Sequence, residues 1–316
     1  MITKQILSCD WGTTSFRLRL VNVKDGEILA EMNEGRGIAA VHNDWLQSNK
    51  PENDRVSFYK IILQSYIKKL HGGDLEGVPF IISGMASSSI GIKELSYSKI
   101  PFDLGGNSLN SLNVLKIVSD EECRHNILLV SGLKTNSDVM RGEETMLVGC
   151  DFGDNAETLA IFPGTHSKHA MVKNRVLIDF KTYMTGEIFD LLANKSILAK
   201  SVIKSEDEKF NSVFETGLKE GAAGNLLNTS FHVRTNQLFK TLSPEENYHY
   251  LSGLVIGTEL KEISATSVNI HLLCGQGLME RYRMALQILM ANGKLQCYDA
   301  DNALIEGHCR LANHFL

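Results

Sequence analysis

The same short unit opens both halves of this 316-residue chain. In each copy an apolar run typical of a strand ends at a Gly-Thr-x-Ser segment, and a strand, a turn and a further strand follow. The copies are Gly12-Thr13-Thr14-Ser15 and Gly164-Thr165-His166-Ser167, and Gly164 lies 152 positions after Gly12. Because the segment recurs at the same point of two strand patterns, the sequence predicts an internally duplicated chain.

Hydrophobic periodicity around the two segments predicts strands and helices in alternation. Phe16, Leu18 and Leu20 alternate with arginines, with the period of two that a half-buried strand shows. Strands are expected over residues 5–9, 16–20, 27–32, 78–83, 126–131, 158–163, 170–172, 175–180 and 268–274. Helices are expected over 55–70, 143–148, 187–193, 213–223, 251–263 and 278–289. This order is typical of an α/β fold in which each half opens on a three-stranded meander.

The length of the chain suggests two domains, each able to bury its own core. No low-complexity linker separates the halves, and the boundary is expected within residues 150–155. We therefore expect an N-terminal domain over 1–153 and a C-terminal domain over 154–299. The last residues, 300–316, are expected to form a helix that packs on the first domain.

Composition argues against several function classes. A net charge of −5 leaves no basic field for nucleic acid, and no run of Lys or Arg suggests an anionic membrane surface. The first nine residues resemble neither a signal peptide nor a transmembrane segment, so a cytoplasmic location is expected. The six cysteines are far apart and are expected to be free buried thiols: Cys9, Cys123, Cys150, Cys274, Cys297 and Cys309.

The repeated segment has the chemistry of an anion-binding turn. Gly12 permits a tight turn that points backbone N–H groups and the Thr13 and Thr14 hydroxyls at one anion. Asp10, just before them, could hold a hydrated Mg²⁺ against the same phosphates. The second copy supplies an opposing loop with these candidate contacts: Gly164, Thr165, His166 and Lys168. Each segment alone could also be an ordinary hairpin turn, but together they favour a polyphosphate site.

A glycine pair late in the chain invites a nucleotide interpretation. Gly275 and Gly277 lie between an expected strand and an expected helix, but Glu280 occupies the third position of a dinucleotide fingerprint. The pair could let an adenine ring approach the backbone, and a simple strand-to-helix turn explains it equally well. No Gly-x-x-x-x-Gly-Lys-Ser/Thr loop occurs, which excludes a P-loop enzyme.

Between the two repeated segments, Asp138-Val139-Met140-Arg141-Gly142-Glu143-Glu144-Thr145 gathers four ionisable groups at a loop-to-helix junction. Acidic residues favour a helix N-terminus through the helix dipole alone. The cluster is therefore either a solvated helix start or a catalytic group, and the residues by themselves leave both interpretations open.

Taken together, these segments resemble the sugar kinase–hexokinase–chaperone–actin superfamily, whose members carry two phosphate loops, two connecting segments and an adenosine loop in this order. The matching segments are Asp10–Arg17, Ile82–Ser87, Phe162–Lys168 and Leu273–Leu278. Within the superfamily, Val139–Thr145, Phe162–Lys168 and Tyr183–Glu187 resemble the 2-dehydro-3-deoxygalactonokinase family, and the resemblance runs over almost the whole chain.

The resemblance implies a two-domain actin-like ATPase fold of the ribonuclease H-like type, with mixed sheets, flanking helices and a central nucleotide cleft. It implies transfer of a phosphoryl group from ATP, with Mg²⁺ at Asp10, to the 6-hydroxyl of 2-dehydro-3-deoxy-D-galactonate in galactonate breakdown. The first domain would bind the sugar acid, with the connecting-segment residues Gly84, Met85 and Ala86 in contact with it. The second domain would bind the nucleotide.

Related kinases carry a catalytic base at the start of the helix before the second phosphate loop. Glu143 is closest to that place, and Asp138 is the alternative with the residue type that those kinases use. The substrate carboxylate calls for an arginine partner. Arg36, between two glycines, is the first candidate; Arg17 is another. Arg141 is a further candidate for catalysis or substrate binding, although pairing with a carboxylate of its own cluster explains it equally well.

Two other interpretations stay open. One is a kinase for another sugar or sugar acid on the same fold, and the other is a non-enzymatic, nucleotide-gated protein in the manner of actin or chaperones. Against the second, the chain lacks a long substrate-binding extension and carries the acid cluster. A homodimer is also left open.

Overall fold

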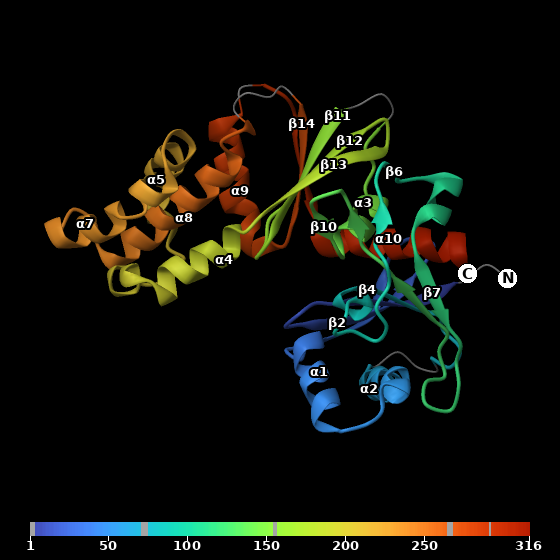
Figure 1. Cartoon of the computed structure of the whole chain (residues 1–316). Coiled ribbons are helices and arrows are strands. Elements are labelled where there is room, and N and C mark those ends of the chain that lie inside the picture. Colours follow the sequence, from blue (N-terminus) through green and yellow to red (C-terminus); the bar gives the residue numbers. More distant parts are fainter. Residues whose placement is uncertain (1–3, 71–74, 154–156, 264–267, 291) are drawn as a thin grey trace. The chain divides into compact units, whose positions relative to one another are not determined.

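The computed structural model describes residues 4–70, 75–153, 157–263, 268–290 and 292–316 (Figure 1). The chain forms two compact units. Unit 1 comprises residues 1–155, 173–179 and 300–316, and unit 2 comprises 156–172 and 180–299. The tip of one hairpin and the last helix are therefore grouped with the N-terminal part of the chain. Within the described ranges, no helix combines the length and the apolar character that crossing a bilayer requires.

The sheet of unit 1 is built around the predicted meander. Its strands follow the order β3-β2-β1-β4-β8-β7. Their bounds are β1 Gln5–Trp11, β2 Phe16–Asn22, β3 Ile28–Glu34, β4 Phe80–Gly84, β7 Val114–Ile117 and β8 Ile127–Val130. β1 is antiparallel to β2 and β2 to β3, whereas β1, β4 and β8 are parallel to one another. Strands β4 and β8 are buried along their whole length, as expected for a sheet covered on both faces.

The second large sheet repeats this order. Its strands run β15-β14-β11-β12-β13, with the short β6 beyond β13. Their bounds are β6 Phe102–Asp103, β11 Glu157–Phe162, β12 Ser167–Lys173, β13 Val176–Tyr183, β14 Asn269–Cys274 and β15 Leu295–Asp299. β11, β14 and β15 are parallel, as β1, β4 and β8 are in the first sheet. The internal duplication and the actin-like ATPase fold are both confirmed.

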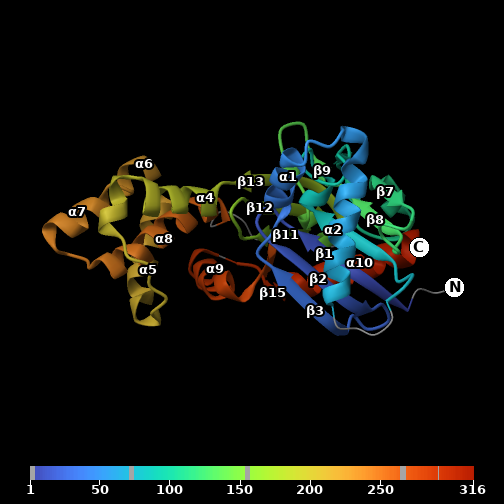
Figure 2. The same cartoon turned by 90° about the horizontal axis from the view of Figure 1, so that it is seen from below.

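Helices flank both sheets. In unit 1, α1 and α2 lie on one face of the sheet and α3 and α10 on the other (Figures 1 and 2). The helices of the chain are α1 Ile38–Gln47, α2 Arg55–Lys69, α3 Glu143–Gly149, α4 Thr185–Asp190, α5 Asn211–Ala223, α6 Leu226–Thr229, α7 His232–Phe239, α8 Pro244–Leu260, α9 Gln276–Leu289 and α10 Ala300–Phe315. A small third sheet contains β5 Ser98–Lys99, β9 Leu133–Lys134 and β10 Val139–Met140.

Helices α5 and α8 pack unusually closely in unit 2. Each helix carries two glycines four residues apart: Gly217 and Gly221 on α5, and Gly253 and Gly257 on α8. At each of the four positions a Cβ atom would lie 2.2 Å from a backbone oxygen of the other helix. The two backbones are therefore in direct contact, which explains why glycines persist in helix interiors where each costs about 1 kcal/mol relative to alanine.

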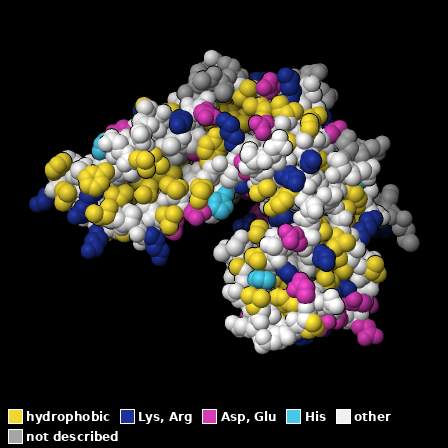
Figure 3. Space-filling model, in the orientation of Figure 1, with side chains coloured by type: hydrophobic (Ala, Val, Ile, Leu, Met, Phe, Trp, Pro, Cys, Tyr) yellow, Lys and Arg dark blue, Asp and Glu magenta, His cyan; other side chains and the backbone are white. Residues whose placement is uncertain are grey.

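The helices α4–α8 gather at one end of the unit 2 sheet and expose apolar side chains (Figure 3). Leu227 and Phe239 are 89% and 74% exposed, respectively, and Phe231 and Leu238 are also exposed.

The hydrophobic core of unit 1 includes the buried Trp11, which packs edge-on against Phe16 with 5.1 Å between the ring centres.

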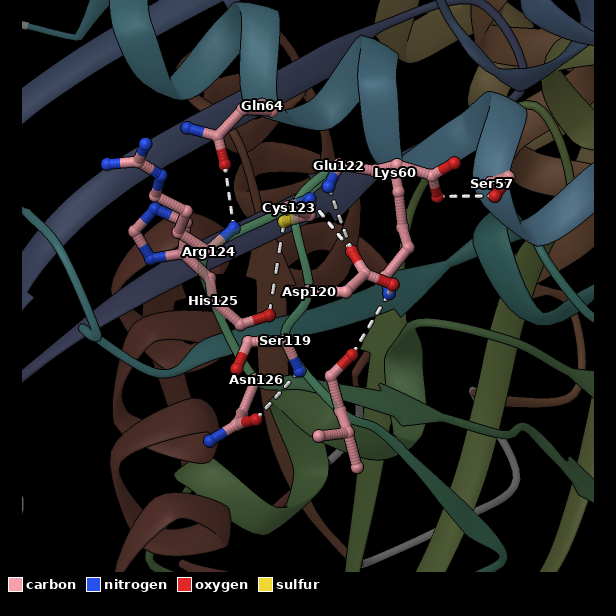
Figure 4. Close-up of polar contacts among 11 residues, drawn as sticks. Ser57, Lys60, Gln64, Ser119, Asp120, Glu122, Cys123, Arg124, His125 and Asn126 are labelled. Carbon is pink, nitrogen blue, oxygen red and sulfur yellow. Dashed lines mark hydrogen bonds and ion pairs between the residues drawn. The ribbon is translucent and has the colours of Figure 1, made fainter.

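A buried lysine holds the loop between β7 and β8 against α2 (Figure 4). Lys60 is 4% exposed; its Nζ donates to Val118 O at 3.0 Å and pairs with Asp120. The Asp120 carboxylate in turn accepts from the N–H groups of Glu122 and Cys123, each at 3.1 Å. The Lys60 ammonium group thus ties Val118 and Asp120 of the loop to α2.

Lys60→Met is therefore expected to lower the free energy of unfolding by about 1–2 kcal/mol, because charge-assisted hydrogen bonds are lost while Asp120 can still reach water. The bond from Lys60 is the main reason that the pKa of Asp120 lies below its ordinary value of 3.8. This stabilisation is present above that pH and is lost as pH falls further, so the deficit should shrink in acid.

Urea unfolding at pH 7 and pH 3 measures both effects. Lys69→Met on the same helix is the control, since Lys69 is exposed and pairs with Glu34 at the surface. Equal losses for the two variants would contradict the role of Lys60.

Candidate active site

The first phosphate loop closes directly after β1. Gly12 N–H donates to Ser15 O at 2.9 Å, which forms the predicted tight turn. Asp10, two residues earlier, is partly exposed, and among the residues that the structure describes no hydrogen bond or ion pair engages its carboxylate. Burial raises the pKa of Asp10, and the nearby Arg17 partly offsets this. A carboxylate without a partner beside a phosphate loop fits a Mg²⁺ position.

The start of α1 is bonded to this loop. Ile38 N–H donates to Gly12 O at 2.9 Å, and Ala39 N–H donates to Thr13 O at 3.1 Å. Gly37 is pressed against the loop, because a Cβ there would lie 2.4 Å from Thr13 O. These contacts place Arg36 directly beside the loop, where its guanidinium pairs with Asp44 of α1.

The second phosphate loop is anchored in the same way. Gly186 N–H donates to Gly164 O at 3.2 Å, and Glu187 N–H donates to Thr165 O at 3.1 Å, both from the start of α4. His166 Nε2 lies 2.5 Å from Glu187 Oε2. The duplication therefore includes the helix that closes each loop, which the sequence did not reveal.

A cavity of about 680 Å³ lies wholly within unit 2. Gly164 and Thr165 of the second phosphate loop line this cavity, as does Gly277 in the first turn of α9. A Cβ at Gly164, Gly275 or Gly277 would meet nothing within 4 Å. Space is thus left at these glycines for a ligand to approach. Its other lining residues come mainly from α4, α5, α8 and α9: Thr185, Gly186, Phe189, Lys204, Glu206, Asn211, Phe214, Tyr248, His249, Ser252, Val255, Ile256, Leu278, Glu280, Arg281, Tyr282 and Met284.

Two further groups shape this half of the site. Arg281 Nη1 donates to Ser252 Oγ at 2.9 Å, and its guanidinium lies 5.4 Å from the Tyr248 ring centre. Tyr282 OH donates to the buried Glu259 at 2.6 Å, and Glu259 also bonds His169 at 2.9 Å. Sequence reasoning missed these residues because they meet across different helices. Lys168, predicted as a nucleotide contact, lies on β12 and is only 7% exposed.

In unit 1, three predicted segments meet at two glycines. Gly84 ends β4 with φ +86, and a Cβ there would lie 2.8 Å from Trp11 O and 3.3 Å from Asp10 Oδ1. Gly142 has φ +111, and a Cβ there would lie 3.7 Å from Gly84 Cα. Only glycine suits these positive φ values at such close approach. The first phosphate loop, the first connecting segment and the acid cluster are therefore brought together.

The arginines of this half have partners. Arg141 Nη1 donates to Ser87 O at 2.6 Å, and its guanidinium lies 4.3 Å from the Tyr97 ring centre. Its guanidinium therefore holds the connecting segment, in which Met85 and Ala86 lie. Within the described ranges no ion pair joins this guanidinium to a carboxylate side chain. Arg17 Nη1 donates to Asp301 of α10 at 2.6 Å.

The acid cluster separates into three environments. Glu143, partly exposed at the start of α3, accepts from Arg141 N–H at 3.0 Å. Asp138 lies in the turn between β9 and β10 and accepts from Val139 N–H at 2.7 Å. Glu144 is fully buried, with an exposure of 0%. Among the described residues no group of three or more His, Cys, Asp or Glu side chains could hold a metal.

Comparison with known proteins shows which protein family this chain belongs to. A family model described as 2-keto-3-deoxy-galactonokinase matches residues 10–311. The chain belongs to the 2-keto-3-deoxy-galactonokinase family. It is thus a carbohydrate kinase, a phosphotransferase, as the resemblance implied.

The names of individual relatives agree with the description of this family. A probable 2-dehydro-3-deoxygalactonokinase of Rhizobium meliloti is 31% identical over 315 residues, which cover 94% of this chain and 93% of that protein. A 2-dehydro-3-deoxygalactonokinase of Escherichia coli is 32% identical over 225 residues, covering 68% and 72%. The crystal structure of a protein from Sinorhizobium meliloti, described as a putative 2-dehydro-3-deoxygalactonokinase, superposes with a TM-score of 0.80 at 28% identity, covering 97% of this chain and 95% of that one.

Proposed function

We propose that this family member transfers the γ-phosphoryl group of ATP to the 6-hydroxyl of 2-dehydro-3-deoxy-D-galactonate. The family match over residues 10–311 carries the proposal. The two phosphate loops, each anchored by a helix of its own unit, would supply the hydrogen-bond donors that phosphoryl transfer needs.

The nucleotide would occupy unit 2. Its adenosine part fits the cavity, where Gly277 leaves the backbone accessible and Arg281 and Tyr248 offer a flat cationic and aromatic wall. The phosphates would meet the second phosphate loop, to which His166 belongs. When bound, Mg²⁺ would neutralise phosphate charge, and Asp10 is the residue of this chain that we expect to hold it.

The sugar acid would occupy unit 1. Glu143 is the base that we favour, because it follows Gly142, which lies against the Gly84 end of β4 beside Asp10. The turn residue Asp138 is the alternative. Taking the proton from the attacking hydroxyl as the bond to phosphorus forms would leave the ADP oxygen as the leaving group.

Arg36 is our candidate for the substrate carboxylate, since its backbone is fixed beside the first phosphate loop. Its pairing with Asp44 occupies part of the guanidinium, and the remaining donors are available to a second carboxylate. Arg36→Ala should raise KM for the sugar acid by about 10–100-fold and leave KM for ATP nearly unchanged. Steady-state kinetics with either substrate varied measures both values.

Asp44→Asn is the matched control for Arg36, because it removes the competing carboxylate and leaves the guanidinium in place. It should not raise the sugar-acid KM. If Arg36→Ala leaves that KM unchanged, Arg36 is excluded and Arg141 becomes the next candidate.

A coupled ATPase assay over a small panel of 2-oxo-3-deoxy sugar acids tests the function itself. Turnover should be fastest with the galactonate derivative and negligible without an acceptor. Faster turnover with the gluconate epimer or a neutral sugar would favour the first alternative, another sugar kinase. Slow hydrolysis that no acceptor accelerates would favour the nucleotide-gated protein. The reaction draws on ATP, which fits a cytoplasmic enzyme, and sedimentation of the purified chain would test for a homodimer.

A further inference from the structure

A continuous chain of buried hydrogen bonds starts at Glu144 and crosses unit 1. Glu144 Oε2 accepts from Gly142 N–H at 2.6 Å, and Glu144 Oε1 lies 3.2 Å from Thr145 Oγ1. Thr145 Oγ1 lies 2.7 Å from Ser83 Oγ. Ser83 Oγ lies 2.9 Å from His308 Nε2, and His308 Nδ1 lies 2.7 Å from Ser8 Oγ. The chain thereby joins α3, β4, α10 and β1.

Water has little access to any part of this chain. Glu144, Thr145, Ser83 and His308 are all 0% exposed, and Ser8 is 1% exposed. Across the described residues no lysine or arginine forms an ion pair with Glu144. An ionised carboxylate is strongly destabilised in such a place, whereas a neutral carboxyl group can accept from Gly142 N–H and donate to Thr145 without a buried charge.

The chemistry of the members allows only two complete patterns. Each hydroxyl has one proton to donate, and a neutral imidazole donates from one nitrogen and accepts at the other. With Glu144 neutral, donation runs from Glu144 to Thr145, to Ser83, to His308 Nε2, and from His308 Nδ1–H to Ser8. With Glu144 ionised, every donation reverses, and the ring proton must sit on Nε2.

The surrounding charges decide which pattern holds at neutral pH. Burial, together with the charge of Glu143, raises the pKa of Glu144 to about 8. Burial lowers the pKa of His308 to about 3, and Arg19 contributes to this, so the imidazole stays neutral. The other charged groups near these hydrogen bonds are already engaged: Arg141 with Ser87, Arg17 and Arg19 with Asp301, and Arg310 of α10 with Val148 O. The Asp10 carboxylate on β1 lies beside Gly84.

We propose that Glu144 is a positioning residue that works in its neutral form and fixes the Gly142 turn against Gly84 beside Asp10. Its ionisation reverses the direction of every hydrogen bond between Glu144 and Ser8 and moves the His308 ring proton from Nδ1 to Nε2. In that step each donor passes its proton to its acceptor, from Glu144 to Thr145, to Ser83 and to His308 Nε2. The Nδ1–H bond of His308 breaks as Ser8 takes that proton, and the proton displaced from Ser8 leaves to solvent, so one proton is lost overall. The inference rests on the proposed phosphoryl transfer only for its kinetic readout.

Glu144→Gln tests the proposal, because a glutamine amide can donate to Thr145 and accept from Gly142 N–H as the neutral acid does. Above pH 8 the wild-type kcat should fall up to tenfold per pH unit, while Glu144→Gln should keep kcat within about threefold of its pH 7 value. Glu144→Ala, which lacks both bonds, should lose at least about tenfold in kcat at pH 7. The exposed Glu121→Gln is the control and should follow the wild type.

Thermal unfolding tests the same group without substrate. A carboxyl group whose folded pKa is raised stabilises the fold below its unfolded pKa, near 4.5, and this stabilisation is lost as pH rises towards 8. The Tm of Glu144→Gln minus that of the wild type should therefore grow by about 5 °C between pH 5 and pH 8. A Tm difference that does not change with pH would overturn the proposal.

Nitrogen NMR of the wild-type chain labelled at histidine tests the tautomer directly and needs no variant. His308 should carry its proton on Nδ1 at pH 6.5, and Nε2–H at that pH would contradict the inferred direction. A hundredfold loss of kcat in Glu144→Gln with an unchanged Tm would also overturn it, because the carboxyl group would then act in the chemistry itself. If no sugar acid is phosphorylated, the proposed function fails, while the Tm and NMR results still decide the role of Glu144.

Discussion

Asp10→Asn is expected to lower kcat by about a thousandfold or more. The carboxylate ends β1 beside the first phosphate loop, has no protein partner among the described residues, and lies against Gly84. Asparagine keeps the shape and removes the charge that would hold Mg²⁺ at the phosphates. Single-turnover and steady-state kinetics at saturating ATP and sugar acid measure the loss.

The fold of Asp10→Asn should be intact, because no hydrogen bond or ion pair joins the carboxylate to another residue that the structure describes. Its Tm should match the wild type or exceed it, since burial raises the pKa of Asp10 and makes the charged form costly. Asp25→Asn, in the turn between β2 and β3, is the control for loss of an acidic charge in the same unit. A near-normal kcat for Asp10→Asn would rule out the metal assignment.

Glu143→Gln is expected to lower kcat by about 10²–10⁴, the usual effect of removing a general base. Its KM values should change little, because the amide preserves the side chain's size and its bond to Arg141 N–H. Asp138→Asn is the matched comparison in the same segment and should retain most of the activity, since Asp138 lies in the β9–β10 turn.

Glu143→Gln and Asp138→Asn together distinguish the two candidates for the catalytic base. A large loss in Asp138→Asn together with an active Glu143→Gln would assign the base to Asp138. If both variants stay active, the proton is taken up elsewhere, and positioning of the two substrates suffices for the reaction.

Strong periodic patterns made most of the fold predictable. The two meanders, α2, α9 and the buried strands β4, β8 and β14 lie within a few residues of their expected ranges, because each shows a clear period or a continuous apolar run. Helix α1 was missed although Ile38, Val41 and Trp45 have helical spacing, since only these three side chains are buried and glycines precede them. The edge strand β15 was missed because its residues are mostly exposed and do not alternate.

The site was predictable only where its residues are contiguous. Both phosphate loops and the Gly277 turn are local motifs, and their neighbours in sequence are their neighbours in space. The partners of Arg17 and Ser83 are different, because Asp301 and His308 lie on the last helix, hundreds of positions from β2 and β4 in the chain. The pairing of Arg141 with Ser87 likewise depends on how two loops meet, for which the sequence carries no periodic signal.

The helix anchoring each phosphate loop has a consequence for binding entropy. Because Gly12 and Thr13 are bonded to the start of α1, and Gly164 and Thr165 to the start of α4, neither loop has to become ordered when a nucleotide arrives. Fixing the backbone of one residue costs about 1–2 kcal/mol, so two pre-ordered loops spare the complex a substantial loss of conformational freedom. The affinity for ATP should therefore depend on contacts and charge, with only a small unfavourable entropy from ordering of the loops.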